Sequence, residues 1–163
     1  YLAYYARTHG LDTVSLRYAN VYGPRQDPHG EAGVVAIFSQ RILDSRPITI
    51  FGNGRQTRDY VFVKDVARAN LLASTAALPP VKRLDDRAIN IGTGIETSVL
   101  DLAESLQRAA TVSVPIEFAP KRDGEQQRSC IRFDKASRLL GWKPGITVET
   151  GLAETYNWFR NPG

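Results

Sequence analysis

The polar residue with the clearest chemical setting is Asn20, which follows a β-rich run at residues 13–18 and begins a long loop that ends at Gly33. An asparagine amide can donate through its NH₂ group to an anionic oxygen. Long ordered loops in compact domains tend to be functional, so we expect Asn20 to contact a ligand. The alternative is structural, with Asn20 starting an Asx turn ahead of Gly23 and Pro24.

Two arginines flank a tight turn further along the chain. Arg55 and Arg58 lie next to the turn Gly52-Asn53-Gly54, in which the Asn-Gly pair is a strong signal for a short hairpin. A planar guanidinium suits a pyrophosphate because it can donate two parallel hydrogen bonds. The alternative is that these arginines pair with Asp59 or Asp65 at the surface, and the pattern alone does not decide between the two.

A third cluster lies in the polar loop at residues 121–128, which carries Arg122, Glu125 and Arg128. An arginine for phosphate and a carboxylate for ribose hydroxyls would suit a nucleotide. The alternative is a charged loop that is simply solvated.

The fourth cluster, Gly92-Thr93-Gly94, follows an apolar run and precedes a helical pattern, as a phosphate-binding loop would. The dinucleotide fingerprint needs a third glycine, however, and Ser98 stands near its place. We interpret the segment as a tight turn followed by a helix whose capping box is formed by Ser98 and Asp101.

The elements that must position these clusters alternate between strands and helices, which predicts an α/β or α+β layered fold. Helical spacing and end signals place helices at residues 1–9, 34–45, 64–77, 134–140 and 147–160, with another beginning at Ser98. Strands are expected at 13–18, 48–51, 58–63, 88–91 and 116–118. Strands 13–18 and 88–91 lead into Asn- and Gly-rich loops at their carboxyl ends, where open α/β sheets bind ligands.

Composition argues against several classes of function. The 163 residues suffice for one domain, and no apolar run reaches the ~18 residues that a membrane span needs. A single cysteine, Cys130, rules out an internal disulfide and fits a reducing, cytoplasmic compartment. With His9 and His29 far apart, no metal site is expected. The net charge is +4 with the basic residues spread along the chain, so we expect a basic phosphate pocket and no nucleic-acid partner.

Taken in order, the clusters resemble the C-terminal half of an extended short-chain dehydrogenase/reductase of the NAD-dependent epimerase/dehydratase family, whose members act on nucleotide sugars. The matching segments are LRYANVYGPRQ (16–26), FGNGRQTRDYVFVKDV (51–66), NIGTGIETSVLDLAE (90–104), KRDGEQQRS (121–129) and KASRLLGWKP (135–144). The segment YGPRQDPHGEAGVVAIF looks most like the UDP-glucose 4-epimerase branch. The resemblance implies the last parallel strands of a Rossmann-like NAD(P)-binding fold plus a small α/β nucleotide-sugar-binding domain, together forming one substrate-binding portion over residues 1–163.

The resemblance also implies how a UDP-sugar diphosphate would be bound. Asn20 would contact the pyrophosphate or the sugar. The backbone N–H groups of Val34 and Val35, at a helix start, would donate to the diphosphate. Arg58 and Arg122 would clamp it from the side chains.

The remaining implied contacts concern the nucleoside and the NAD cofactor. The edge formed by Thr49, Ile50 and Phe51 would meet the uracil, and Glu125 would take the ribose hydroxyls. Tyr18 would lie near the nicotinamide.

Catalysis in this family uses a bound NAD that takes hydride from sugar C4 while a tyrosine phenolate takes the hydroxyl proton. It requires a G-x-x-G-x-x-G loop and a Tyr-x-x-x-Lys pair. Tyr1, Tyr4 and Tyr5 have no lysine four residues later, and the chain begins inside a helical pattern. We therefore expect that an N-terminal dinucleotide-binding portion is absent, that no catalytic residue lies in this chain, and that the isolated chain is inactive.

Other functions are also consistent with these sequence segments. A dTDP-glucose 4,6-dehydratase or a UDP-glucuronate decarboxylase would share these segments, and so would a non-catalytic nucleotide-sugar-binding module. One departure is Arg132, which stands where the family usually has aspartate, so that Asp134 is expected to cap helix 134–140. The resemblance further implies a homodimer formed through the helix that ends near residue 9.

Overall fold

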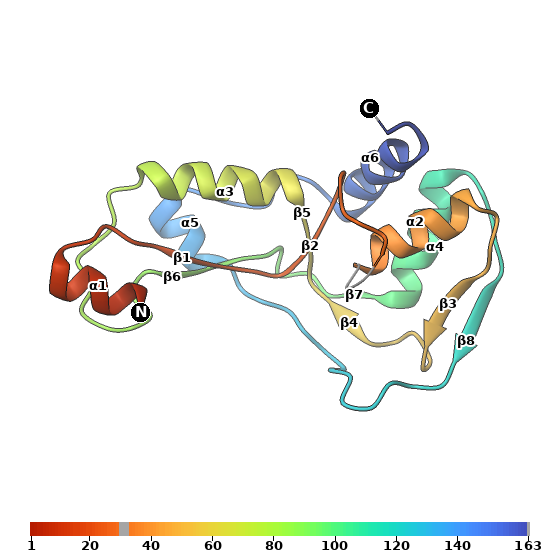
Figure 1. Ribbon diagram of the computed structural model, residues 1–163, viewed down its shortest axis with the longest axis horizontal. Coiled ribbons are helices and arrows are strands. Elements are labelled where there is room, and N and C mark those ends of the chain that lie inside the picture. Colours follow the sequence, from red (N-terminus) through yellow and green to blue (C-terminus); the bar gives the residue numbers. More distant parts are fainter. Residues whose placement is uncertain (30–32, 163) are drawn as a thin grey trace.

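The computed structural model describes residues 1–29 and 33–162, and the part of the predicted loop at residues 30–32 lies outside the described residues. Helices and strands alternate along the chain (Figure 1). The helices are α1 (Leu2–His9), α2 (Val34–Leu43), α3 (Val63–Thr75), α4 (Val99–Ala110), α5 (Asp134–Leu140) and α6 (Val148–Arg160). The strands are β1 (Ser15–Tyr18), β2 (Asn20–Tyr22), β3 (Ile48–Phe51), β4 (Thr57–Arg58), β5 (Tyr60–Phe62), β6 (Ala88–Ile91), β7 (Thr97–Ser98) and β8 (Ile116–Ala119).

Most strand pairs are parallel. β1 pairs with β6, β2 with β5, and β3 with β8, each in parallel, whereas the short β4 and β7 pair antiparallel. Parallel neighbours cannot be joined by a tight hairpin, so the connections cross over through helices. The predicted α/β fold is confirmed.

The core has two parts, and β5 lies between them. Tyr60 and Phe62 pack into the first part, with buried residues of α2, α4 and α6, whereas Val61 packs into the second, with residues of α3, α5 and β6. Successive side chains of a strand point to opposite faces, which explains this division. Figure 1 shows the first group of helices at one end of the molecule and α3 and α5 beside the β1–β6 pair at the other. All three residues of β5 are buried, as expected of a strand covered on both faces.

Two predicted strands differ from the structure because the chain changes its partner. Strand 13–18 does not give way to a loop at Asn20, which instead begins β2. The Ala19 N–H donates to the Ile91 carbonyl at 2.9 Å and the next N–H, of Asn20, to the Asp59 carbonyl at 2.8 Å, so pairing moves from β6 to the β5 side. Strand 58–63 is likewise divided at Asp59 into β4 and β5.

Of the hairpin predicted at Asn53-Gly54, the turn is present but the pairing of the flanking strands is not. Gly52 and Gly54 have φ values of 71° and 73°, so the predicted turn is confirmed. The flanking strands do not pair with each other, however, because β3 pairs with β8 and β4 with β7. The Leu100 N–H instead donates to the Gly54 carbonyl at 3.0 Å, which ties the turn to the start of α4.

Helix capping follows the prediction at one site and contradicts it at another. The Ser98 hydroxyl oxygen accepts from the Asp101 N–H at 3.0 Å, as a capping residue does. Asp134 is the first residue of α5 and its side chain makes no cap bond, so that prediction was wrong. Its carboxylate accepts from Arg132 Nε at 2.8 Å instead, and Arg132 is the residue that departs from the family pattern.

Candidate functional site

A cavity of about 400 Å³ lies where α2, β3, β4 and the loop after β8 meet. Eight of the nine residues predicted to bind substrate line it: Asn20, Val34, Thr49, Ile50, Phe51, Arg58, Arg122 and Glu125. These residues come from five separate segments of the chain. The fold therefore brings to one cavity eight of the residues that the family resemblance implied.

The ninth residue predicted to bind substrate, Val35, and the residue predicted to lie near the cofactor, Tyr18, lie elsewhere. Val35 lines a smaller adjoining cavity together with Asn20, Val34 and Tyr60. Tyr18, predicted to lie near a nicotinamide, does not line either cavity. Its hydroxyl donates to Asn70 Oδ1 on α3 at 3.0 Å, and 45% of its surface is exposed.

The start of α2 lies at the cavity, where Gly33 and Val34 are part of the lining. Its N-cap is Gly33, and no described side chain caps this end of the helix. The first turn of a helix leaves N–H groups without intrahelical partners, and the helix dipole favours an anion there. A Cβ at Gly33 would lie 2.3 Å from Gln26 Nε2, so a larger residue here would displace the end of the Gln26 side chain.

Arg58 is held with its guanidinium at the cavity wall. Nη1 donates to the carbonyls of Thr57 at 2.8 Å and Gln126 at 2.7 Å, and Nη2 lies 4.0 Å from Glu125 Oε1. The alternative pairing with Asp59 or Asp65 is wrong for Arg58. Arg55 is exposed and lies outside the cavity lining, so of the two arginines flanking the turn only Arg58 faces the cavity.

Arg122 approaches from the loop after β8. Its guanidinium carbon lies 3.8 Å from the centre of the Phe51 ring, a cation–π contact. Glu125, from the same loop, accepts from Gln56 Nε2 at 3.4 Å. The lining thus contains two arginines and one carboxylate, so its net charge favours an anion.

Two further polar residues of the lining were missed by the sequence reasoning. Gln56 is 5% exposed, and its amide donates to the Phe51 carbonyl at 2.9 Å as well as to Glu125. Tyr60 is 3% exposed, and burial raises the pKa of its hydroxyl to about 12 against the opposing charge of Arg58. The hydroxyl therefore remains a donor at neutral pH. The signal for Tyr60 was its spacing of two from Arg58, which places both side chains on one face of an extended chain.

The Gly92–Gly94 loop does not fit the diphosphate of a dinucleotide. The Asp59 carboxylate accepts from the N–H groups of Thr93 at 2.9 Å and Gly94 at 3.0 Å, so these donors are already taken. This arrangement agrees with the prediction of a tight turn before a capped helix.

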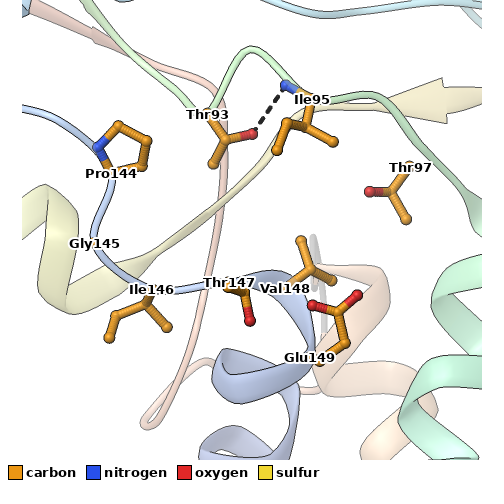
Figure 2. Close-up of a pocket in the computed structure, with 9 residues that line it drawn as sticks. All are labelled: Thr93, Ile95, Thr97, Pro144, Gly145, Ile146, Thr147, Val148 and Glu149. Carbon is orange, nitrogen blue, oxygen red and sulfur yellow. Dashed lines mark hydrogen bonds between the residues drawn. The ribbon is translucent and has the colours of Figure 1, made fainter.

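A second cavity, of about 340 Å³, lies between this loop and the start of α6 (Figure 2). Ile95 and Thr97 form one wall, and the segment from Pro144 to Glu149 forms the other. The Thr93 hydroxyl accepts from the Ile95 N–H at 3.2 Å, which shapes the first wall. The charged residue of this lining is a carboxylate, so it disfavours a phosphate, and no predicted site residue lies here.

Residues 1–29 and 33–162 contain no group of three His, Cys, Asp or Glu side chains arranged to hold a metal ion. Of the helices in the same residues, none has the length and apolar character needed to cross a membrane.

Comparison with known proteins gives this geometry a context. The family model described as "NAD dependent epimerase/dehydratase family" matches residues 1–92. A UDP-glucose 4-epimerase of Mycolicibacterium smegmatis is 44% identical over 161 residues, which are 99% of this chain and 50% of that protein. A dTDP-glucose 4,6-dehydratase of Actinoplanes is 34% identical over 157 residues, or 96% of this chain and 46% of that protein.

Among solved structures, the UDP-glucose 4-epimerase of Thermotoga maritima with UDP-glucose superposes with a TM-score of 0.91 at 44% identity. The match covers 99% of this chain and 50% of that one. The α/β arrangement of parallel strands is thus that of the Rossmann-type fold of the epimerases. The chain spans about half the length of the relatives that it matches.

Proposed function

This chain belongs to the NAD-dependent epimerase/dehydratase family, and on that basis we propose that it forms the UDP-sugar-binding part of a UDP-glucose 4-epimerase. The observation that carries the proposal is the 400 Å³ cavity, which collects eight predicted ligand-binding residues around a positively charged wall. UDP-glucose and UDP-galactose are the proposed substrates. The proposed reaction is inversion at sugar C4 through transient oxidation.

The diphosphate would lie between the two arginines and the start of α2. Arg58 and Arg122 supply guanidinium groups, which bind phosphate oxygens through charge-assisted hydrogen bonds. The first-turn N–H groups at Val34 and Val35 add donors on a third side. Asn20, at the start of β2, would reach the pyrophosphate or the sugar.

The nucleoside would lie along β3. Thr49, Ile50 and Phe51 line the cavity, and in the described part of the chain β3 is paired with one strand, β8. Apart from the Phe51 carbonyl, which accepts from Gln56 Nε2, the backbone groups of the other edge can therefore pair with a uracil, which presents both a donor and acceptors. Glu125 would accept from the ribose hydroxyls.

NAD would supply the hydride acceptor for the oxidation at C4. The Gly92–Gly94 loop does not fit its diphosphate, because the N–H groups of Thr93 and Gly94 already donate to Asp59. We therefore propose that NAD is bound mainly by a portion of the relatives that this chain does not span, with Tyr18 as the contribution of this chain near the nicotinamide. We place no catalytic residue in the chain and expect the isolated chain to be inactive.

The match to a dTDP-glucose 4,6-dehydratase keeps a second enzyme of the family as the alternative. A UDP-glucuronate decarboxylase and a non-catalytic nucleotide-sugar-binding module would use the same cavity. The nucleotide and the reaction product distinguish these candidates, since a dehydratase of this kind would prefer the thymine nucleotide and release water.

We further propose a homodimer formed through α1, in a cytoplasmic enzyme without a nucleic-acid or membrane partner. Helix α1 has no buried residue, and Tyr4 and Tyr5 are 57% and 46% exposed. Apolar surface of this kind marks protein–protein contacts.

Calorimetric titration of the chain with UDP-galactose, UDP-glucose, UDP, dTDP-glucose and NAD tests the proposal. We expect saturable binding of the UDP ligands, weakened by about tenfold or more in Arg58→Ala and in Arg122→Ala, because each loses a charge-assisted hydrogen bond. Arg55→Ala is the matched control, since Arg55 is exposed in the same turn. Tighter binding of dTDP-glucose would favour the dehydratase, and absence of any nucleotide binding would count against the proposed function.

A further inference from the structure

Asp59 lies between two cavity residues, Arg58 and Tyr60, but its side chain points away from the cavity and is 1% exposed. The carboxylate accepts from the Thr93 N–H at 2.9 Å, from the Thr93 hydroxyl at 2.6 Å and from the Gly94 N–H at 3.0 Å. A further bond comes from the Ile131 N–H at 3.3 Å. One buried carboxylate thus joins three segments of the chain.

The glycine before Thr93 makes this approach possible. A Cβ at Gly92 would lie 2.6 Å from Asp59 Oδ2 and 2.6 Å from Ile131 Cγ1. Real Cβ atoms do not come this close to other heavy atoms, so Gly92 is needed for Asp59, the loop and Ile131 to converge. The close packing of Asp59, the Gly92–Gly94 loop and Ile131 therefore depends on the glycine at position 92.

The segment that Asp59 holds at Ile131 continues the loop that carries Arg122 and Glu125. Thr57 exchanges backbone hydrogen bonds with this segment, to the Gln127 carbonyl at 2.9 Å and from the Ser129 N–H at 3.1 Å. The Gln126 carbonyl accepts from Arg58 Nη1 at 2.7 Å. The position of the segment thus determines where the Arg58 guanidinium lies as well as where Arg122 and Glu125 lie.

A second carboxylate touches the same segment, but at the surface. Glu96 accepts from Arg128 Nε and Nη2 at 3.1 and 2.6 Å, and the Arg128 side chain is 78% exposed. Ion pairs of this kind contribute little because solvent screens them. The buried bonds to Asp59 are not screened in this way, so they provide the stronger anchor.

We propose that Asp59 is the positioning residue of the diphosphate clamp. By fixing Ile131 against the Gly92–Gly94 loop, it sets the loop that carries Arg122 relative to β4, which carries Arg58, before a ligand arrives. A clamp that is already ordered loses less conformational freedom on binding, which raises affinity. The ligand class in this inference rests on the proposed function, whereas the ordering of the segment does not.

The test compares two variants of buried carboxylates. In Asp59→Asn an NH₂ group replaces one carboxylate oxygen and must face N–H donors. The substitution therefore breaks part of the hydrogen bonding at residue 59 while the size of the side chain stays nearly the same. The control is Asp65→Asn, because Asp65 is 4% exposed and accepts from the Gly145 and Ile146 N–H groups at 2.9 and 3.0 Å and from Arg68 Nη2 at 2.9 Å, away from the cavity lining. We expect Asp59→Asn to weaken UDP binding by about tenfold or more and Asp65→Asn by less than about twofold.

The backbone N–H of Ser129 gives a readout that does not depend on a ligand. It lies two residues before Ile131 and donates to the Thr57 carbonyl at 3.1 Å, so it joins the segment to β4. The rate at which this N–H exchanges its hydrogen, measured by NMR, therefore reports how often the segment opens away from β4.

The proposal expects severalfold faster exchange of the Ser129 N–H in Asp59→Asn and unchanged exchange in Asp65→Asn. Unchanged exchange in Asp59→Asn would overturn it, as would equal weakening of UDP binding by the two variants. If the wild-type chain does not bind UDP, the proposed function fails, and the Ser129 exchange rate still decides whether Asp59 orders the segment.

Discussion

Gly151 is the position where α6 comes closest to β2, and its replacement by alanine gives a demanding test of the packing. A Cβ at Gly151 would lie 2.1 Å from the Tyr22 hydroxyl oxygen, 2.8 Å from Tyr22 Cζ and 3.0 Å from Phe62 Cδ2. The Tyr22 hydroxyl also donates to the Val148 carbonyl at 3.3 Å. Tyr22 and Phe62 are 2% and 1% exposed, so neither ring has open space to move into.

The expected change in the free energy of unfolding combines three terms. Alanine favours a helix over glycine by about 1 kcal/mol, which stabilises the variant. Inserting a methyl group into a closely packed site costs about 1–3 kcal/mol. Displacing the Tyr22 hydroxyl from Val148 costs about 1 kcal/mol more. The sum is a net destabilisation of about 1–3 kcal/mol for Gly151→Ala.

Urea unfolding of four proteins checks both the sign and the cause: wild type, Gly151→Ala, Tyr22→Phe and the double variant. Tyr22→Phe removes the atom that would lie nearest to the new methyl group, so the double variant should recover roughly 1 kcal/mol relative to additivity. A Gly151→Ala chain as stable as wild type would refute the close approach of α6 to β2. Strict additivity in the double variant would show that the hydroxyl is not the atom responsible.

Three further predictions concern polar contacts. Arg128 and then Thr57 hold the pKa of Glu96 at about 2, below the ordinary 4.5, so its stabilising effect is complete above pH 4.5 and is lost as pH falls toward 2. The difference in Tm between wild type and Glu96→Gln should therefore shrink over that range in thermal scans. Ser98→Ala should lower the free energy of unfolding by about 0.5–2 kcal/mol in urea, because α4 loses its cap. Asp59→Ala should leave an anion site at the Gly92–Gly94 loop, so formate should raise the Tm of this variant and not that of wild type.

Local patterns predicted most elements of this fold because the relevant physics is local. Gly10 ends α1 in the left-handed region, with φ 65°, as its place after a helical pattern indicated. The choice of strand partner is not local, and the errors arose there. Asn20 begins β2 only because the chain passes from β6 to the β5 side, and nothing within a few residues of Asn20 encodes that step.

The candidate site likewise contains some residues that the sequence predicts and others that it does not. Arginines and a loop asparagine are conspicuous in a sequence, since their side chains suit phosphate chemistry, and the structure brings them to one cavity. Gln56 and Tyr60 are not conspicuous by residue type, and their spacing of two from Arg58 becomes informative only once the inward face of the chain is known. Arg58 shows a related limit, as its partners are the carbonyls of Thr57 and Gln126 and not the nearby carboxylates that the sequence offered.

The Gly92–Gly94 loop shows what a glycine pattern specifies and what it leaves open. Glycines allow successive N–H groups to converge on one point, and an anion at that point is stabilised whatever its source. Here the anion is the carboxylate of Asp59, supplied by the same chain 34 residues before Thr93. Because this carboxylate is covalently part of the fold, it competes for these N–H donors more effectively than a free phosphate does. The loop therefore holds β4 and Ile131 together through Asp59, and in the proposed function the diphosphate is bound instead by Arg58, Arg122 and the start of α2.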